Sequence, residues 1–595
     1  MASENTLKLL KGGEFLIADV PPETVFTPED FTEEQIAIGD TAEQFLRNEV
    51  LPHVEKLESH DFDLMVKLLR QFGELGMLMI DAPEEYGGLE LPKTTSLFAA
   101  EKSSMYGGFS TAYAAHSGIG TLPLVYYGTK EQKEKYLGKI ITGEWLAAYC
   151  LTEPEAGSDA LGCRTVATLS PDGKHYILNG TKQFITNGSF ADLYTVFAKI
   201  DREHFTAFLV ERTFPGVSPG PEEKKMGIKG SSTTPLILED AQVPVENVLG
   251  EIGKGHKIAF NVLNVGRLKL GACVTGGAKY VTGEAAQYAN LRKQFGAPIG
   301  TFGAIREKFA DMVAATYASE SVTYRVGGII DERLSTLEKG IPRYYEAYQA
   351  GIEEYSMECA IAKVFCSEVM AQVADHAVQV YGGYGYTQEY PAERAYRDER
   401  INRIFEGTNE INRMLIPGTL LKRALKGELP LQDEVMKAVG RLSAPAADPP
   451  AVPFGAEKQL LRNLKDAFLV LAGAAVQRFA AKLKDEQEVL IALADLAIGV
   501  FALESAILRA ERIAASGNAM RTELSGAATK VFAFQAQEDC TTAARRAAFY
   551  IGEGAMLKTL LTGIRRSGRY EAAGLLEAKR MLAAATLEKE RYPIY

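Results

Sequence analysis

The chain changes its pattern at one stretch, which reads Tyr149-Cys150-Leu151-Thr152-Glu153-Pro154-Glu155-Ala156-Gly157-Ser158-Asp159. Before this stretch, over residues 32–148, apolar residues recur every three to four positions, as at Leu64, Leu68 and Phe72. That spacing predicts helices. After it, over residues 149–248, short β-branched and aromatic runs alternate with turns, which predicts strands. A helical domain is therefore followed by a small β domain.

Helical periodicity returns near Lys257 and continues to Leu425. The Pro- and Ala-rich residues 443–453 then predict a linker, because proline has no amide hydrogen to donate and cannot continue a helix. We predict a mainly α protein with a central β domain. Its parts are an N-terminal extension (residues 1–31), an N-terminal helical domain (32–148), a middle β domain (149–256), a helical bundle (257–425), a linker (426–455) and a C-terminal helical domain (456–595).

Composition places the chain among soluble globular proteins. It has 595 residues, of which 46% are hydrophobic and 24% charged, so several cores are expected. No run of 18 uncharged apolar residues occurs, so we predict no membrane-spanning helix. The first 30 residues carry more Asp and Glu than Lys, which is the wrong sign of charge for a secretory or organellar leader, and we expect a cytoplasmic protein.

Cysteine spacing and charge exclude several classes of function. The six cysteines show no Cys-x-x-Cys spacing and pair with no His cluster, so neither a zinc site nor a disulfide framework is predicted. Net charge is −12, yet residues 457–595 carry 20 Lys and Arg against 16 Asp and Glu. This basic excess could form a surface that binds an acidic partner or anionic lipid. Alternatively, the basic residues only keep the helices solvated. No basic stripe is interleaved with aromatics, so nucleic-acid binding is not expected.

A second stretch contains a candidate catalytic base. It reads Tyr396-Arg397-Asp398-Glu399-Arg400-Ile401-Asn402-Arg403-Ile404-Phe405-Glu406-Gly407-Thr408-Asn409-Glu410-Ile411. A carboxyl group beside the apolar Ile404 and Phe405 loses solvation, which raises its pKa toward the range of a general base. Gly407 allows close backbone approach, and Thr408 can cap a following helix. We predict that Glu406 is the base.

Together with Phe184-Ile185-Thr186-Asn187-Gly188, these two stretches resemble the signature segments of the acyl-CoA dehydrogenase family. Their order and spacing fit over the first 425 residues, and the helical segment after residue 455 resembles the very-long-chain branch and its bacterial relatives. The resemblance implies an N-terminal helical domain, a middle β-barrel and a four-helix bundle, followed by an extra C-terminal helical domain. It also implies a homodimer, because the family's cofactor site is shared between subunits and such an extension covers surface that a tetramer would use.

The implied activity is the FAD-dependent conversion of medium-to-long-chain acyl-CoA to trans-2-enoyl-CoA. Glu406 would remove the α-proton, its amide would bind the thioester oxygen, flavin N5 would take the β-hydride, and electrons would pass to an electron-transfer flavoprotein. Other subgroups carry the base immediately before an arginine that matches Arg267, but this chain has Gly266 there. An acyl-CoA oxidase, or an assembly protein that keeps the fold, remains an alternative.

The resemblance also assigns binding residues, with no metal ligand among them. The isoalloxazine set is Tyr149, Leu151, Thr152, Gly157, Ser158, Phe184, Ile185 and Thr186. The set for the rest of FAD, partly in a neighbouring subunit, is Arg292, Gln294, Phe295, Gln379, Gly382, Gly383, Thr408 and Glu410. The substrate set is Ser158, Asn264, Arg267, Phe405 and Gly407. Many relatives have Trp at the position of Phe184. Arg292 could instead be a charged residue on a helix surface, and Asn264 and Arg267 could instead serve only helix packing.

Overall fold

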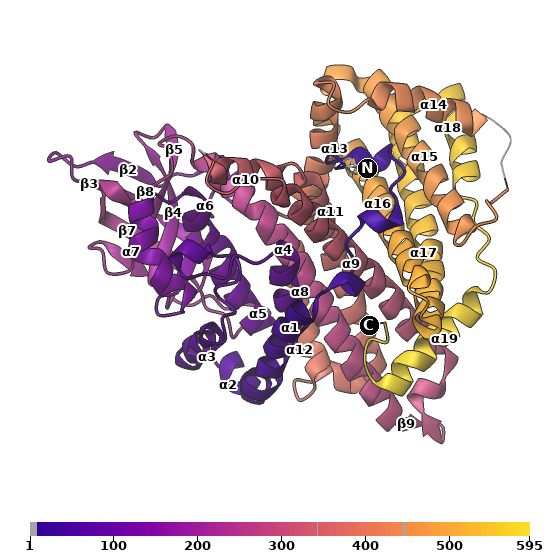
Figure 1. Cartoon of the computed structure of the whole chain (residues 1–595), viewed down its shortest axis with the longest axis horizontal. Helices are drawn as coiled ribbons and strands as arrows, with labels where there is room; N and C mark the ends of the chain where they lie inside the picture. Colours follow the sequence, from indigo (N-terminus) through magenta and orange to yellow (C-terminus); the bar gives the residue numbers. More distant parts are fainter. Residues whose placement is uncertain (1–8, 342, 444–447, 595) are drawn as a thin grey trace, which may run out of the picture.

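A computed structural model describes residues 9–341, 343–443 and 448–594 (Figure 1). Residues 1–8 of the predicted N-terminal extension and residues 444–447 of the predicted Pro/Ala linker lie outside this description. Figure 1 shows the β domain at one end of the molecule, the long bundle helices in the middle and the C-terminal helices at the other end.

The N-terminal domain is helical, as the periodicity predicts. Two of its helices begin at capping boxes of the form Thr-x-x-Gln: the hydroxyls of Thr32 and Thr129 accept the amides of Gln35 and Gln132. Its helices are α1 (Glu33–Phe45), α2 (Val54–Glu58), α3 (Phe62–Glu74), α4 (Lys93–Lys102), α5 (Gly107–Ala114), α6 (Leu122–Tyr127) and α7 (Lys130–Ile141). A π-helical turn at Ala115–Gly120 joins α5 to α6 and places α5 against the bundle.

The middle domain is one eight-stranded sheet with strand order β6-β7-β3-β2-β4-β5-β8, and β1 pairs in parallel with β4. The strands are β1 (Ala147–Cys150), β2 (Val166–Leu169), β3 (His175–Thr186), β4 (Leu193–Ile200), β5 (His204–Glu211), β6 (Val217–Pro219), β7 (Thr233–Pro244) and β8 (Val248–Leu249). The hydrogen-bonded path runs from β6 at one end to β8 at the other. A register shift in β3 between Lys182 and Ile185 turns Phe184 outward, with φ of 58°.

The bundle consists of α8 (Gly255–Leu291), α9 (Gly303–Ser335), α11 (Ser356–Tyr381) and α13 (Asn409–Leu425). Shorter elements join them: the hairpin β9 (Lys293–Gln294) and β10 (Ala297–Pro298), and helices α10 (Tyr344–Glu353) and α12 (Pro391–Glu399). Gly271 and Gly277 of α8 are buried against Cys366 and Met370 of α11, which lets these two helices pack closely. The loop between α12 and α13 carries Glu406.

Six helices form the C-terminal domain: α14 (Leu431–Ser443), α15 (Gly455–Phe479), α16 (Gln487–Ala515), α17 (Ala519–Ile551), α18 (Gly554–Ser567) and α19 (Leu575–Lys589). Helix α14 lies inside the segment predicted as a linker, so that prediction is wrong for residues 431–443. Apolar residues along α14 pack on α15, and the neighbouring Pro-rich residues do not extend into this helix. Helix α16 is long and apolar enough to cross a membrane, but 83% of its most apolar window is buried inside the protein.

Buried ion pairs join the chain's first and last described segments to the bundle. The guanidinium of Arg509 on α16 pairs with Glu29 at 2.9 Å and with Glu320 of α9 at 2.5 Å. The hydroxyl of Tyr592, which is fully buried, donates to the same Glu320 at 3.2 Å. Near the start of the chain, the amide of Gly13 donates to Glu358 of α11 at 2.7 Å. The extension and the C-terminal domain are therefore parts of one packed body.

Candidate active site

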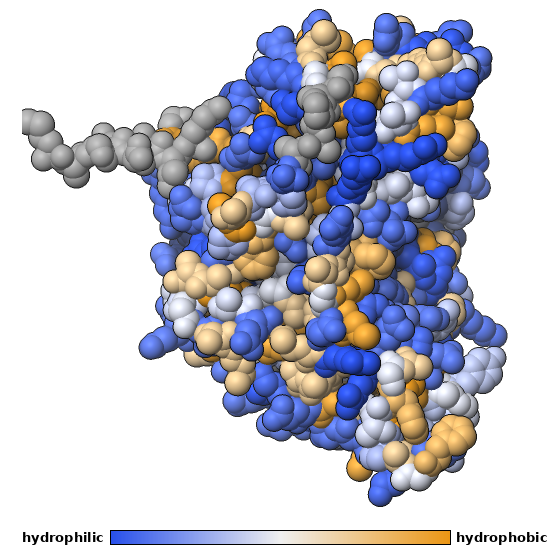
Figure 2. All heavy atoms as spheres, turned by 90° about the vertical axis from the view of Figure 1, so that its right-hand side faces the viewer, coloured by the Kyte–Doolittle hydropathy of each residue, from blue (hydrophilic) through white to orange (hydrophobic). Residues whose placement is uncertain are grey.

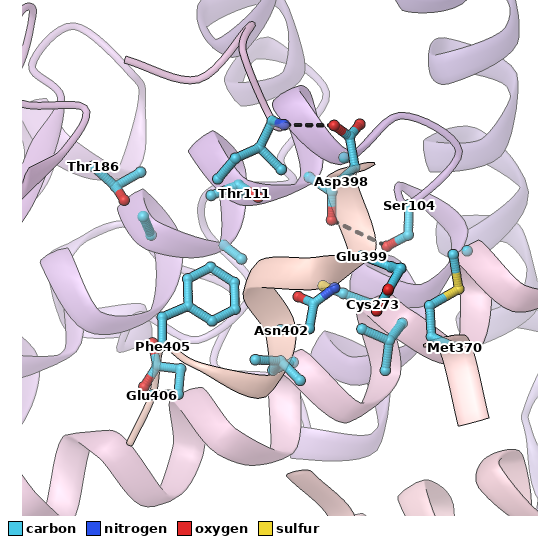
Figure 3. Close-up of a pocket in the computed structure, with 18 of the residues that line it drawn as sticks. Ser104, Thr111, Thr186, Cys273, Met370, Asp398, Glu399, Asn402, Phe405 and Glu406 are labelled. Atoms are coloured by element: carbon cyan, nitrogen blue, oxygen red, sulfur yellow. Dashed lines mark hydrogen bonds between the residues drawn. The ribbon is translucent and has the colours of Figure 1, made fainter. Parts of the chain in front are cut away.

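A cavity of about 330 Å³ lies where the β domain, α5, α8 and the loop before α13 meet. In Figure 3, Thr186 and Glu406 lie toward one end of this cavity, and Cys273 and Met370 lie toward the other. Twelve of the predicted residues line it: Tyr149, Leu151, Thr152, Gly157, Ser158, Phe184, Ile185, Thr186, Arg267, Phe405, Glu406 and Gly407. Segments that are far apart in the sequence thus form one site.

The loop that carries the candidate base has two consecutive residues in left-handed conformation. Glu406 has φ of 58° and Gly407 has φ of 79°. Such a conformation is unfavourable for a glutamate and occurs mostly at functional sites. The loop ends at Thr408, whose hydroxyl accepts the amide of Ile411 and caps α13 as predicted. The turn and cap fix the direction of the Glu406 side chain.

The carboxylate of Glu406 is enclosed although the residue as a whole is only half-buried. Its Oε2 atom is buried and has no hydrogen-bond partner among the described residues. Loss of solvation raises the pKa of Glu406 to about 7, against the opposing effect of the cations Arg267 and Lys363. A pKa near neutrality suits a group that must accept a proton from carbon and later release it.

Gly266 on α8 makes room for this carboxylate. A Cβ atom at position 266 would lie 2.7 Å from Oε2 and 3.0 Å from Cδ of Glu406. Both distances are shorter than ordinary van der Waals contact, so a side chain at residue 266 and the present position of Glu406 exclude each other. The prediction that Glu406 replaces a base at position 266 therefore agrees with the geometry.

Three side chains bind the carbonyl oxygens of the base loop. Arg267 Nε donates to the Glu406 carbonyl at 3.2 Å, and its Nη1 donates to Asn264 Oδ1 at 3.1 Å. Asn412 Nδ2 donates to the Gly407 carbonyl at 2.8 Å, and Lys363 Nζ donates to the same oxygen at 2.7 Å. Asn264 is not among the residues that line the cavity, so in this subunit it orients Arg267 and does not face the predicted substrate.

Lys363 and Asn412 were missed by the sequence reasoning. Lys363 stands alone within the apolar helix segment Cys359-Ala360-Ile361-Ala362-Lys363-Val364-Phe365-Cys366. A lone charge in such a run does indicate a buried cation that needs a partner, since unpaired buried charges are costly. Nothing local identifies the partner, because the base loop lies more than 40 positions away along the chain.

The wall opposite Glu406 has the chemistry that a flavin ring requires. Phe184 presents its exposed ring to the cavity, and a Cβ at Gly157 would meet nothing within 4 Å. Within the described part of the chain, no protein group hydrogen-bonds the hydroxyls of Thr152 or Thr186, so both are available to a ligand. An apolar face with free hydroxyl donors at its rim fits a planar heterocycle with polar edges.

The other cofactor residues do not reach this cavity within one subunit. They are Arg292, Gln294, Phe295, Gln379, Gly382, Gly383, Thr408 and Glu410. The guanidinium of Arg292 lies 5.3 Å from the ring centre of Tyr384, so the hairpin and the Gly382–Tyr386 turn form one surface. Phe295 at the hairpin tip is 96% exposed, and Cβ atoms at Gly382 and Gly383 would meet nothing. This surface is open to a partner.

Beyond the base, the cavity continues between α5, α8 and α12. Small residues of α5 and the turn after it, Gly107, Ala114 and Ala115, line one side, and Gly277 and Val281 of α8 line the other. Glu399 and Asn402 also line this part (Figure 3). The small side chains leave depth for a chain of several methylene groups.

Comparison with known proteins agrees with this geometry. Models of the acyl-CoA dehydrogenase N-terminal, middle and C-terminal domains match residues 32–144, 148–241 and 253–421, and a further acyl-CoA dehydrogenase C-terminal domain model matches residues 463–566. A probable acyl-CoA dehydrogenase of Bacillus subtilis (strain 168) is 46% identical over 98% of both chains. The crystal structure of an acyl-CoA dehydrogenase complexed with FAD from Bacillus anthracis has a TM-score of 0.96 and 49% identity, and covers 98% of this chain and 100% of that one.

A third relative has a name that states a narrower specificity. The mitochondrial very long-chain specific acyl-CoA dehydrogenase of Mus musculus is 37% identical over 76% of this chain and 70% of its own length. The matches to all four domain models, and the identity over nearly the whole length, establish that the chain belongs to the acyl-CoA dehydrogenase family. The predicted family, fold and enzyme class are thereby confirmed.

Proposed function

We propose that this FAD-dependent enzyme oxidises medium-to-long-chain acyl-CoA thioesters to trans-2-enoyl-CoA, the first oxidation of fatty acid β-oxidation. The observation that carries the proposal is the enclosed carboxylate of Glu406, which lies between an apolar, small-residue channel and a wall that fits a flavin. One side of the site takes an acyl chain, the other takes the cofactor, and the base lies between them.

The chain's own residues account for the proton transfer. Glu406 accepts the α-proton: the C–H bond breaks, an O–H bond forms on its carboxylate, and the electron pair stays with the substrate. The amide of Glu406 is turned by the left-handed loop and, as in the family, would donate to the thioester oxygen where charge develops. FAD, when bound, supplies the acceptor for the β-hydride. Removal of bulk water by the apolar walls strengthens these interactions.

The chain-length preference follows from the depth of the channel. Because Gly107, Ala114, Ala115 and Gly277 contribute little volume, a long acyl chain has space beyond the base. The likeness to a very long-chain specific relative supports the same preference. We propose an electron-transfer flavoprotein as the electron acceptor. The competing possibility is that the reduced flavin passes its electrons to oxygen, as in an oxidase. Turnover measured with and without oxygen separates the two, because only an oxidase needs oxygen.

The decisive experiment is anaerobic titration of the purified FAD protein with saturated acyl-CoAs of graded length, following loss of flavin absorbance. We expect bleaching with an optimum among long chains, and none by a Glu406→Gln variant that retains FAD. An FAD-loaded wild type that no acyl-CoA bleaches would contradict the proposed activity and favour the assembly-protein alternative.

We also propose that the enzyme is a homodimer whose FAD is held partly by the partner subunit. Support comes from the exposed surface formed by Arg292, Phe295 and Tyr384, residues that the cavity of one subunit does not use. An Arg292→Ala variant should lose FAD on gel filtration, whereas Lys293→Ala on the same hairpin should retain it. A tetramer by light scattering, or full FAD retention by Arg292→Ala, would contradict this assignment.

Contact with an anionic membrane is proposed for the C-terminal domain. Helix α18 exposes Lys558, Arg565 and Arg566, and the face in Figure 2 carries separate apolar patches between hydrophilic residues. Basic residues near a membrane each contribute about 1 kcal/mol of attraction to anionic lipid. We expect the protein to co-sediment with phosphatidylserine vesicles but not with phosphatidylcholine vesicles. Equal binding to both kinds of vesicle, or binding to neither, would contradict the proposal.

A further inference from the structure

Lys363 lies on α11 directly behind the base loop and is fully buried. Its Nζ donates to the carbonyl of Gly407 at 2.7 Å and to Oδ1 of Asn409 at 2.6 Å. Both acceptors belong to the turn that links Glu406 to α13. One buried ammonium group therefore holds the residue after the base and the first residue of the helix that follows.

This is an electrostatically unfavourable place for a cation. Burial of an ammonium group is costly, and the amino-terminal end of α13 presents the positive end of the helix dipole. Burial accordingly lowers the pKa of Lys363 to about 7, against the attraction of Glu406. The cost of burying the Lys363 ammonium group is therefore offset by attraction to an anionic group nearby.

The charged groups around Lys363 identify that partner. Arg267 of α8 is a second cation. Glu368 of α11 is occupied, because its oxygens accept from Asn409 and Arg413. Glu410 of α13 is exposed to solvent. Glu406 is the remaining carboxylate. It forms no direct ion pair with Lys363 in the described structure, so its attraction acts over a longer distance, and its Oε2 has no hydrogen-bond partner among the described residues.

Hydrogen bonding alone does not explain the lysine. The Gly407 carbonyl already accepts from Asn412 Nδ2 at 2.8 Å, and Thr408 caps α13 through its hydroxyl. The Gly407 carbonyl and the Thr408 cap would therefore be satisfied without Lys363, and Oδ1 of Asn409 would keep a longer contact from Ser367 Oγ at 3.4 Å. Besides its hydrogen bond to Asn409, Lys363 adds a positive charge, which Asn412 cannot supply.

We infer that Lys363 is a positioning residue for the dehydrogenation: its ammonium group fixes the Glu406–Gly407 turn and keeps the Glu406 carboxylate in the ionised form that accepts the α-proton. Lys363 itself transfers no proton and touches no substrate. The inference rests on the proposed function, since it concerns the ionisation of the proposed base.

The test uses a 3-thia-acyl-CoA, in which sulfur replaces the β-carbon. Its α-proton can be removed, but it has no β-hydride to transfer, so deprotonation gives an anion that forms a long-wavelength charge-transfer band with oxidised FAD. Because the α-proton moves to Glu406, the pH midpoint of this band reports the loss of one proton from the pair formed by Glu406 and the ligand. It is measured for wild type and for Lys363→Met and Asn412→Ala, two variants that each remove one donor to the Gly407 carbonyl.

Removal of the cation from beside Glu406 raises the pKa of the carboxyl, so the midpoint of Lys363→Met should move upward by about one pH unit or more. Asn412→Ala removes a hydrogen bond but no charge, and its midpoint should stay within about 0.3 unit of wild type. Retained FAD absorbance shows that each variant is folded. If Lys363→Met does not fold, Lys363→Gln, which keeps a donor without the charge, should show the same upward movement.

Two results overturn the inference: an unchanged midpoint in the charge-removing variant, or equal movement in Lys363→Met and Asn412→Ala. A wild type without a band at any pH would instead overturn the proposed function itself, and so the two failures are distinguishable.

Discussion

The carboxylate of Glu406 fills the space that a side chain at position 266 would need. Its Oε2 lies 2.7 Å from where a Cβ atom on residue 266 would be, and residue 266 is glycine. The two residues come from different elements, α8 and the loop before α13, yet neither can change size alone. The identity of residue 266 therefore determines whether the base can stand at position 406.

A Gly266→Ala substitution should displace the Glu406 carboxylate by a fraction of an ångström or more. Misplacement of a reacting group by about 1 Å costs on the order of 10²-fold in rate, so we expect flavin bleaching by acyl-CoA to slow by about 10- to 100-fold. Stopped-flow absorbance measures this rate. Gly418→Ala on α13, where a Cβ meets nothing within 4 Å, is the matched control and should bleach at the wild-type rate.

The pH dependence of turnover should report the raised pKa of Glu406. The base acts when ionised, and burial raises its pKa to about 7, so kcat/KM should rise about tenfold per pH unit below 7 and level off above it. Steady-state assays between pH 5.5 and 9 with a constant acceptor check this. A flat profile through that interval would mean that the carboxylate is not enclosed in solution.

Arg509 should be a stability residue. Arg509→Met would remove the cation that Glu29 and Glu320 share, while Glu29 keeps Arg521 and Glu320 keeps Lys279. Breaking a buried pair outright costs about 3–5 kcal/mol, so we expect a loss of part of that amount. Arg546→Met removes an exposed pair with Asp495 and should cost about 0–1 kcal/mol. Thermal unfolding of both variants measures the difference. Equal melting temperatures would show that the buried network contributes little.

Glu358 should make stability depend on pH. Burial raises its pKa from 4.5 to about 7, so the folded state holds this proton more tightly than the unfolded chain does. Its stabilising contribution is present below pH 4.5 and is lost as pH rises through 7. Glu358→Gln, which stays neutral, should therefore raise Tm relative to wild type more at pH 8 than at pH 5. The reverse order would contradict the burial of an unpaired carboxylate here.

Local sequence chemistry accounts for the parts of the site that the sequence predicted. The Glu406 turn and the Thr408 cap are set by adjacent residues, and the switch from helical to strand periodicity near Tyr149 located the β domain. The lone charge of Lys363 indicates a buried cation, but its partners lie more than 40 positions away and no local pattern identifies them. Gly266 was found only through the family resemblance, because its contact with Glu406 joins distant segments. Helix α14 was not predicted, because it lies next to a Pro-rich segment that is typical of a linker. The edges of the sheet depend on strand pairing, which periodicity does not specify.

The buried hydroxyl of Tyr592 has a consequence for how the protein is made. Glu320 belongs to a bundle helix that leaves the ribosome early, but two of its partners, Arg509 and Tyr592, are translated long after the bundle is complete. Until then the nascent bundle holds a carboxylate that awaits its partners. We expect the bundle to stay accessible to proteases and chaperones during translation and to close only when the last helix has emerged.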